Sequence, residues 1–177
     1  MQIVVIKNGM FLEYGSDHIK NDSQIVLKAV CQNPRAFKLA GEIPRKDPVV
    51  VLEAIEGTWG VELEEVTNLM HFDCWTNADI VIALIRKNFN YLRKAHDGLK
   101  RNVLFVCIAL WSRNANDLLL WIHPDMWGNE DVVEDIIRLV LQKQLNMLWL
   151  DKIASSLFEN EVFILRCIHN TKHLNMR

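Results

Sequence analysis

A pattern that returns about every 25 residues constrains this fold more than any other feature of the sequence. Segments 22–30 and 47–55 carry it most clearly, because each begins with aspartate and continues as an apolar strip ending in Ala-Val or Ala-Ile. The strip returns at 80–85 and 105–110, with weaker copies at 132–137 and 163–168. Self-similarity at this period is typical of stacked supersecondary units rather than of a fold built around one centre.

A residue suited to capping a helix stands three positions before every copy of the strip. These residues are Asp22, Asp47, Asn77, Asn102, Asn129 and Asn160. Their side chains accept hydrogen bonds from the unpaired N–H groups of a helix's first turn, so we expect a helix of about ten residues after each. A second series, Asn8, Asn33, Thr58 and Asn88, predicts the start of a second helix of about eight residues in each unit.

Helices this short are marginal alone and need neighbours that bury their apolar faces. We therefore predict an all-α fold of about six tandem helix hairpins, an α-solenoid-like array forming a single domain over residues 1–177. Two connectors, 67–75 and 122–128, are longer than the others. Both ends of the sequence fall inside a unit, which indicates either a fragment of a longer array or a protein with atypical terminal caps.

Composition agrees with a folded helical chain. Half of the residues are hydrophobic, and seven glycines and four prolines are few for an all-β protein. The net charge of −2 supplies no overall field to attract nucleic acid or an anionic membrane. The four cysteines are widely spaced and lack a C-x-x-C pair, which favours a reducing compartment over disulfides or zinc. We expect a cytoplasmic protein with no cofactor, no metal and no membrane partner.

Residues 22–40, followed by Pro-Arg-Lys-Asp at 44–47 and a second apolar strip, resemble the DUF4116 repeat family. The resemblance is good over about residues 1–60, fair over 77–102 and poor beyond, and Pro34 stands where the family usually has glycine. That family recurs in tandem in proteins of bacterial pathogens, protists and large DNA viruses and has no established activity. The resemblance therefore implies a helical array, a place in the host-cell cytosol and no particular reaction.

The charged residues are unevenly distributed. Between 42 and 79 there are nine acids and two bases, whereas between 86 and 113 there are seven bases and one acid. A basic face could bind phosphates or an acidic partner, with Phe89 and Tyr91 available for stacking. Its candidate residues are Arg86, Lys87, Arg93, Lys94, Lys100 and Arg101. The simpler alternative is that the two segments face each other and solvate the surface of the array.

Histidine and cysteine offer weaker candidates. His71 with Asp73 and His123 with Asp125 lie in the two long connectors, and an acid–base or metal site would require both pairs to converge on one pocket. A chance scatter of six histidines is the simpler interpretation. Two cysteines occupy apolar strip positions and are predicted to be core residues, and two are expected to be more exposed. The first pair is Cys107 and Cys167, and the second is Cys31 and Cys74.

Six tryptophans are many for 177 residues, and tryptophan is common both in cores and at binding sites. We assign Trp111, Trp121 and Trp149 to the core, and Trp75 and Trp127 to the surface as candidates for partner binding. The predicted function is a non-catalytic protein-interaction scaffold that acts on host proteins. A nucleic-acid-binding repeat that uses residues 86–101 is the alternative, and an enzyme is the third hypothesis.

Overall fold

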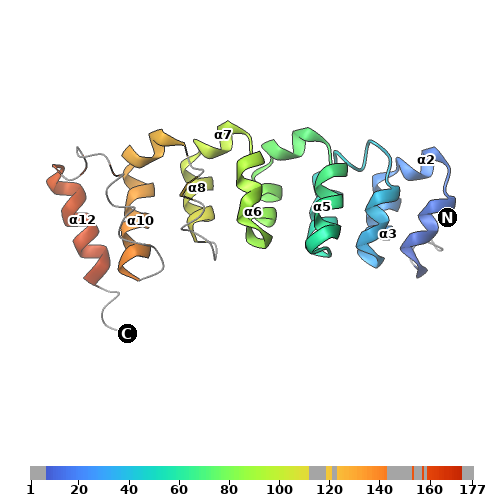
Figure 1. Cartoon of the computed structure of the whole chain (residues 1–177), viewed down its shortest axis with the longest axis horizontal. Helices are drawn as coiled ribbons and strands as arrows, with labels where there is room; N and C mark the ends of the chain where they lie inside the picture. The colour runs from blue at the N-terminus through green and yellow to red at the C-terminus, as the bar shows by residue number, and fades with distance from the viewer. Residues whose placement is uncertain are drawn as a thin grey trace. The chain divides into compact units, whose positions relative to one another are not determined.

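The protein is described by a computed structural model covering residues 7–111, 119–120, 123–142, 153, 157 and 159–172. All regular elements in these ranges are helical (Figure 1), and none of the residues in them forms a strand. The all-α prediction is therefore confirmed. No helix in the same ranges is both long and apolar enough to cross a membrane. The chain divides into two units, Met1–Lys87 and Asn88–Arg177, which are described separately, and the single domain stays a prediction.

The first unit alternates longer α-helices with short helical turns. Its elements are η1 (Gly9–Tyr14), α2 (Asp17–Lys20), α3 (Ser23–Gln32), η2 (Pro34–Leu39), α4 (Pro48–Glu56), α5 (Gly60–Leu69), η3 (Phe72–Thr76) and α6 (Ala78–Lys87), where η marks a 3₁₀-helix. Helix α4 packs against both α3 and α6, and α5 packs against η2. Within this unit, the helices that follow the predicted caps are therefore neighbours in chain order.

The second unit repeats this alternation. Its described elements are η4 (Phe89–Lys94), α7 (Asp97–Lys100), α8 (Val103–Leu110), η5 (Pro124–Gly128), α10 (Glu130–Leu141) and α12 (Glu161–Lys172). Helix α10 packs against α8 on one side and against α12 on the other, and Figure 1 shows these three helices side by side. The contacts of α10 matter below because its two sides meet helices of different chemistry.

All six predicted caps of the first helices are confirmed. Each side-chain oxygen accepts a hydrogen bond from a backbone N–H two or three residues ahead, at 2.9–3.2 Å. The acceptors are Asp22, Asp47, Asn77, Asn102, Asn129 and Asn160, and they precede α3, α4, α6, α8, α10 and α12. Satisfying these first-turn donors stabilises helices that are too short to persist alone.

The apolar strip supplies the core. The third, fourth, seventh and eighth residues after a cap lie on one face of a helix, because 3.6 residues make a turn. In α3 these are Ile25, Val26, Ala29 and Val30, and in α8 they are Phe105, Val106, Ala109 and Leu110. All eight side chains are at most 8% exposed. The spacing in the sequence therefore selects the buried face of each helix.

The predicted second helices differ from expectation in type and length. Asn8, Asn33 and Asn88 do act as caps, but the elements that they start are six-residue 3₁₀-helices rather than α-helices of about eight residues. The prediction that Thr58 is also a cap is wrong. Thr58 is 2% exposed and its hydroxyl donates to the carbonyl of Ala54 at 2.8 Å. A hydroxyl bonded back to the preceding turn is not available to cap the next helix.

The extra length in the first half of the chain lies in α5, which has ten residues where η2 and η4 have six. Helix α5 begins at Gly60, whose φ of 55° lies in the left-handed region that glycine adopts without strain. The predicted location of this expansion, 67–75, overlaps only the last turn of α5 and covers most of η3.

The connectors contain a third short helical turn that the sequence reasoning missed. Histidine side chains cap three of these turns, because Nδ1 of His71, His96 and His123 accepts from the backbone N–H two residues ahead at 3.1–3.3 Å. Backbone bonds join successive turns: Gly41 donates to the Lys20 carbonyl (2.7 Å), and His71 to the Arg45 carbonyl (3.0 Å). In the second unit, His123 donates to the Lys100 carbonyl (3.5 Å).

Candidate partner-binding surface

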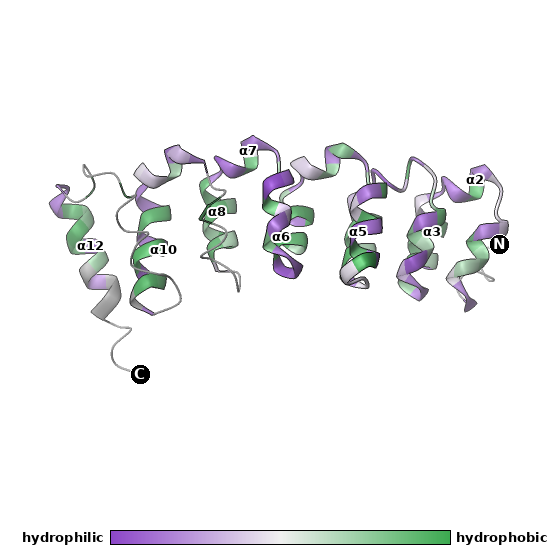
Figure 2. Ribbon diagram, viewed as in Figure 1, coloured by the Kyte–Doolittle hydropathy of each residue, from purple (hydrophilic) through white to green (hydrophobic). Residues whose placement is uncertain are grey.

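Helix α8 is apolar on all sides, since its sequence Val-Leu-Phe-Val-Cys-Ile-Ala-Leu contains no charged or amide side chain. Only one face of a helix can be buried against its neighbours in a two-layer arrangement. The remaining apolar side chains therefore stay in solvent: Leu104 is 69% exposed, Ile108 41% and Trp111 47%. Figure 2 shows hydrophobic colouring along the whole of α8.

These three residues form one stripe, because positions separated by four and three residues lie above one another on a helix. We call Leu104, Ile108 and Trp111 the α8 ridge. The prediction that Trp111 belongs to the core is wrong. Trp111 is the ninth residue after its cap and lies one turn beyond Ile108 on the outward side, where the periodicity that buries Leu110 leaves it exposed.

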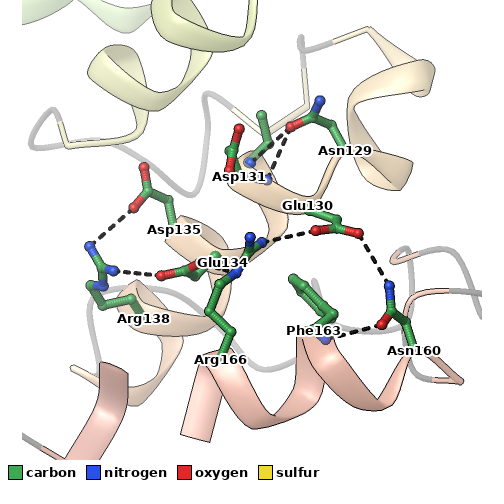
Figure 3. Close-up of polar contacts among 10 residues, drawn as sticks. Asn129, Glu130, Asp131, Glu134, Asp135, Arg138, Asn160, Phe163 and Arg166 are labelled. Atoms are coloured by element: carbon green, nitrogen blue, oxygen red, sulfur yellow. Dashed lines mark hydrogen bonds and ion pairs between the residues drawn. The ribbon is translucent and has the colours of Figure 1, made fainter. Parts of the chain in front are cut away.

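Helix α10 carries the opposite chemistry on its outward face, where acidic residues predominate. Arg138 pairs with Glu134 at 2.8 Å and with Asp135 at 3.4 Å, both on its own helix. Arg166 reaches across from α12 to Glu130 at 3.1 Å and to Glu134 at 2.9 Å (Figure 3), the latter as an ion pair without hydrogen-bond alignment. The side of α10 that faces α12 is therefore neutralised by arginine.

The other side of α10 places carboxylates beside α8. Burial, together with the negative charge of the Asp135 and Asp131 carboxylates, raises the pKa of the Cys107 thiol to about 12. Cys107 is half-buried, between the fully buried strip and the α8 ridge. The side chain of Asp131 is exposed and forms no ion pair with the residues that the structure describes. Within the described residues, a carboxylate without an ion-pair partner therefore lies on the side of α10 that faces α8.

Four of the six predicted basic residues are engaged in contacts within the chain. Lys87, in the first unit, donates to the carbonyls of Glu56 and Thr58 at 2.8 Å each and lies 4.1 Å from the ring centroid of Trp59. Burial lowers the pKa of Lys87. Its ammonium donates to free carbonyls at the C-terminal end of α4 and lies over the exposed Trp59 indole, so the charge stabilises the fold.

The basic residues of the second unit are used in a similar way. Lys100 donates to the carbonyl of Arg93 and to the carboxylate of Asp97, both at 3.3 Å. Arg101 pairs with Asp125 at 3.3 Å.

Other members of the predicted basic face are more open to solvent. Lys94 is exposed and lies 5.8 Å from the ring centroid of Tyr91, while Arg86 and Arg93 are exposed. The stacking platform is smaller than predicted, because Tyr91 is only 8% exposed and Phe89 is half-buried. A nucleic-acid interface through this segment stays a prediction that rests mainly on the exposed arginines.

The two tryptophans predicted as surface residues, Trp75 and Trp127, are both half-buried. Trp127 packs against a core cluster formed by Val133, Ile153, Leu157, Phe163 and Cys167. Each stands four residues after a capping histidine, where one side of the ring is covered. Trp59, at 65%, is the most exposed of the described tryptophans. Trp121 and Trp149 lie outside the described residues.

The histidine–aspartate pairs are local capping arrangements. His71 Nδ1 lies 3.1 Å from Asp73 Oδ2, and His123 Nδ1 lies 3.2 Å from Asp125 Oδ2. The two pairs belong to different units, and within the described ranges no three or more His, Cys, Asp or Glu side chains gather as metal ligands would. The interpretation of these histidines as a chance scatter is corrected by their common role. Spacings of 25 and 27 residues between His71, His96 and His123 were the available signal.

The cysteines follow the periodicity only in part. Cys167 is buried and Cys31 is exposed, as predicted, but Cys74 is 3% exposed and not accessible. Burial raises the pKa of the Cys74 thiol, which keeps it protonated and unreactive. A cavity of about 10 Å³ lined by Phe37, Thr58 and Val66, among others, has room for about one water molecule.

Comparison with known families finds one match. The chain is similar to the family DUF4116, described as a domain of unknown function, over residues 1–44. The match confirms the resemblance over the segment from η1 to η2 and is shorter than the predicted extent of 1–60. Neither the curated proteins nor the solved structures yield a match to this chain.

Proposed function

We propose that the chain is a non-catalytic protein-interaction scaffold whose helices form a tandem repeat array. Three recurring features support the repeat: the caps before six helices, the four buried positions after the caps of α3, α4, α6 and α8, and the backbone bonds that join successive third turns. In such arrays each unit contacts its neighbours, and the side chains on one exposed face carry recognition.

The observation that carries the proposal is the exposed α8 ridge. Large apolar side chains that point into water do not stabilise the core. Clusters of such side chains are uncommon on the surface of single-domain proteins. Tryptophan is enriched at the hot spots of protein interfaces, and the ridge surrounds an exposed tryptophan with further apolar side chains. The outward face therefore supports binding rather than a reaction.

The nucleic-acid alternative is weaker. Lys87, Lys100 and Arg101 already contact groups within their own units, and a phosphate would have to compete with those contacts. Only the exposed cations, chiefly Arg86 and Arg93, support the alternative.

Photo-crosslinking distinguishes the two functions. The full chain would carry a photoreactive amino acid at an outward position of α3, α4, α8 or α12, one position at a time, in an extract of the cells that make it. A protein interaction predicts crosslinks to the same protein from α8 and weaker or no crosslinks from α3. Crosslinks that do not depend on position, or that persist against an excess of unlabelled chain, would contradict the proposal.

The second arm measures nucleic-acid binding directly by fluorescence anisotropy with mixed-sequence RNA and duplex DNA. The alternative predicts tight binding at 50 mM salt that weakens steeply at 200 mM, and loss of binding in Arg93→Glu/Lys94→Glu. The scaffold proposal predicts no such binding. Steep, charge-dependent binding would replace it with the alternative.

A further inference from the structure

The α8 ridge has dimensions that suit one kind of partner element. Leu104 and Trp111 are separated by seven residues, which corresponds to about 10 Å along the axis at 1.5 Å per residue. A ridge of side chains four residues apart packs into the groove between similar rows on another helix. Two turns of a partner helix would cover the ridge, whereas an extended strand would need a sheet edge, and the described residues contain no strand.

The border of the ridge adds a charge requirement. Asp131 is exposed and unpaired in the described part of the chain, and Asp135 lies beside Cys107 on the same side of α10. A partner helix whose edge carried acids would meet like charge at this border. A helix whose edge carried lysine or arginine would gain favourable pairs and faster association.

The chain itself shows how a helix meets the opposite side of α10. Helix α12 buries Phe163 and Cys167 against Val133, while Arg166 on the same helix pairs with Glu130 and Glu134 (Figure 3). Helix α10 therefore already packs against a helix that has an apolar stripe in the centre of the contact and an arginine at its edge. Asp131 and Asp135 form the next row of carboxylates on α10, toward α8.

We propose that the α8 ridge, bordered by Asp131, binds an amphipathic α-helix of a partner protein whose apolar stripe is flanked by lysine or arginine. The proposal deepens the proposed function and rests on it. Two other occupants fit less well. A second copy related by a two-fold axis would bring its own Asp131 toward the same border. An anionic membrane would be repelled by these carboxylates.

The test uses the full chain and two synthetic helical peptides as probes. One peptide has leucine at i, i+3, i+4 and i+7 and lysine elsewhere, and the other replaces every lysine by glutamate. Binding is measured by fluorescence anisotropy of the labelled peptide. We expect the lysine peptide to bind about tenfold more tightly than the glutamate peptide, as roughly 1.4 kcal/mol of edge electrostatics would produce.

Two substitutions locate the site. Leu104→Glu should weaken binding of the lysine peptide at least about tenfold, because it places a charge in the apolar contact. The matched control is Val162→Glu, which stands at the same position after its cap in α12, is 77% exposed, and should leave binding unchanged. Asp131→Lys should reverse the preference between the two peptides. Circular dichroism confirms that each variant is folded.

Several results would overturn the inference. Equal affinity for both peptides, or equal loss in Leu104→Glu and Val162→Glu, would show that binding is unspecific. A concentration-dependent dimer in sedimentation that Leu104→Glu abolishes would make a second copy the occupant. Crosslinking that identifies a protein at α8 while the lysine peptide does not bind would retain the proposed function and reject only the basic helix. If neither a crosslink at α8 nor binding of the lysine peptide is found, both the proposed function and the basic-helix partner are rejected.

Discussion

Helices α8 and α10 are neighbours in the second unit, begin at the same type of cap and bury the third, fourth and seventh residues after it, yet their outward faces are opposite in chemistry. The outward residues of α8 are Leu104, Ile108 and Trp111, while those of α10 are mostly acids held by Arg138 and Arg166. The comparison shows that the buried positions alone build the helix pair. The outward positions are left free to differ, which is where binding chemistry can be placed.

The largest effect should come from the shared buried positions. Phe105→Ala in α8 should lower the free energy of unfolding by about 3–5 kcal/mol, and Ile136→Ala in α10 by about 2–5 kcal/mol, because each leaves a cavity in the packed face. Leu104→Ala, on the exposed ridge, should change it by less than about 0.5 kcal/mol. Urea unfolding followed by circular dichroism measures all three. A large effect at Leu104 would mean that the ridge belongs to the core.

The caps should contribute equally to both helices. Asn102→Ala and Asn129→Ala should each lower the free energy of unfolding by about 1 kcal/mol, since a first-turn N–H loses its acceptor. Asp at either position retains an acceptor and should restore most of the stability. Asn90→Ala, at an exposed position that does not cap a helix, is the control. An effect at only one of the two caps would show that the helices are not equivalent.

The ion pairs of α10, which α8 lacks, should make its contribution to the free energy of unfolding depend on salt. Arg166→Gln should lower the free energy of unfolding by about 0.5–1 kcal/mol at low salt, because its partner Glu134 is only 14% exposed. In 1 M NaCl most of the difference should vanish, since screening weakens the pair. The control Arg93→Gln, exposed in η4, should have no effect at either salt concentration. A loss unaffected by salt would point to packing of the arginine stem instead.

The smallest expected effect is the pH dependence of stability that comes from Cys107, whose side chain lies between α8 and α10. Burial and the α10 carboxylates raise its pKa to about 12, so at neutral pH the thiol is protonated in the folded and unfolded states and stability is independent of it. Between pH 9 and 12 the unfolded thiol ionises first, so stability falls as pH rises. Iodoacetamide at pH 8.5, followed by peptide mass spectrometry, should modify exposed Cys31 well before Cys107. Asp135→Asn should speed the reaction of Cys107.

The elements that sequence reasoning predicted well are those whose cause is local. A side-chain oxygen next to a helix's first turn needs only the three following residues to make its hydrogen bond, so all six first-helix caps were readable. The strip that follows also carries its buried face in its own spacing. For the same reason Asn33 and Asn88 were correctly predicted as caps.

The errors arise where burial or a distant contact decides. Thr58 has the side chain of a cap, but burial at the end of α4 turns its hydroxyl toward the carbonyl of Ala54. Cys74 lies in a connector and is nevertheless buried, with its sulfur 3.6 Å from the Arg45 carbonyl. Lys87 was predicted as a surface charge, and its ammonium is held by two carbonyls about thirty residues earlier in the chain. The contacts of Cys74 and Lys87 have no local signature, and for Thr58 it is burial that decides which local partner its hydroxyl takes.

What the sequence determines and what only the tertiary structure decides differ in the distance along the chain over which the residues act. Caps, helix starts and the inward face of each helix depend on residues within about one turn, and the order of amino acids alone specifies them. The exposure and the pairing of every other side chain depend on which parts of the chain pack next to it. Only the packed structure shows that Trp111 is exposed while Trp127 is half-buried, and that Asp131 borders the α8 ridge while Glu134 binds arginine. Local hydrogen bonding is encoded residue by residue, whereas exposure and charge pairing are properties of the assembled fold.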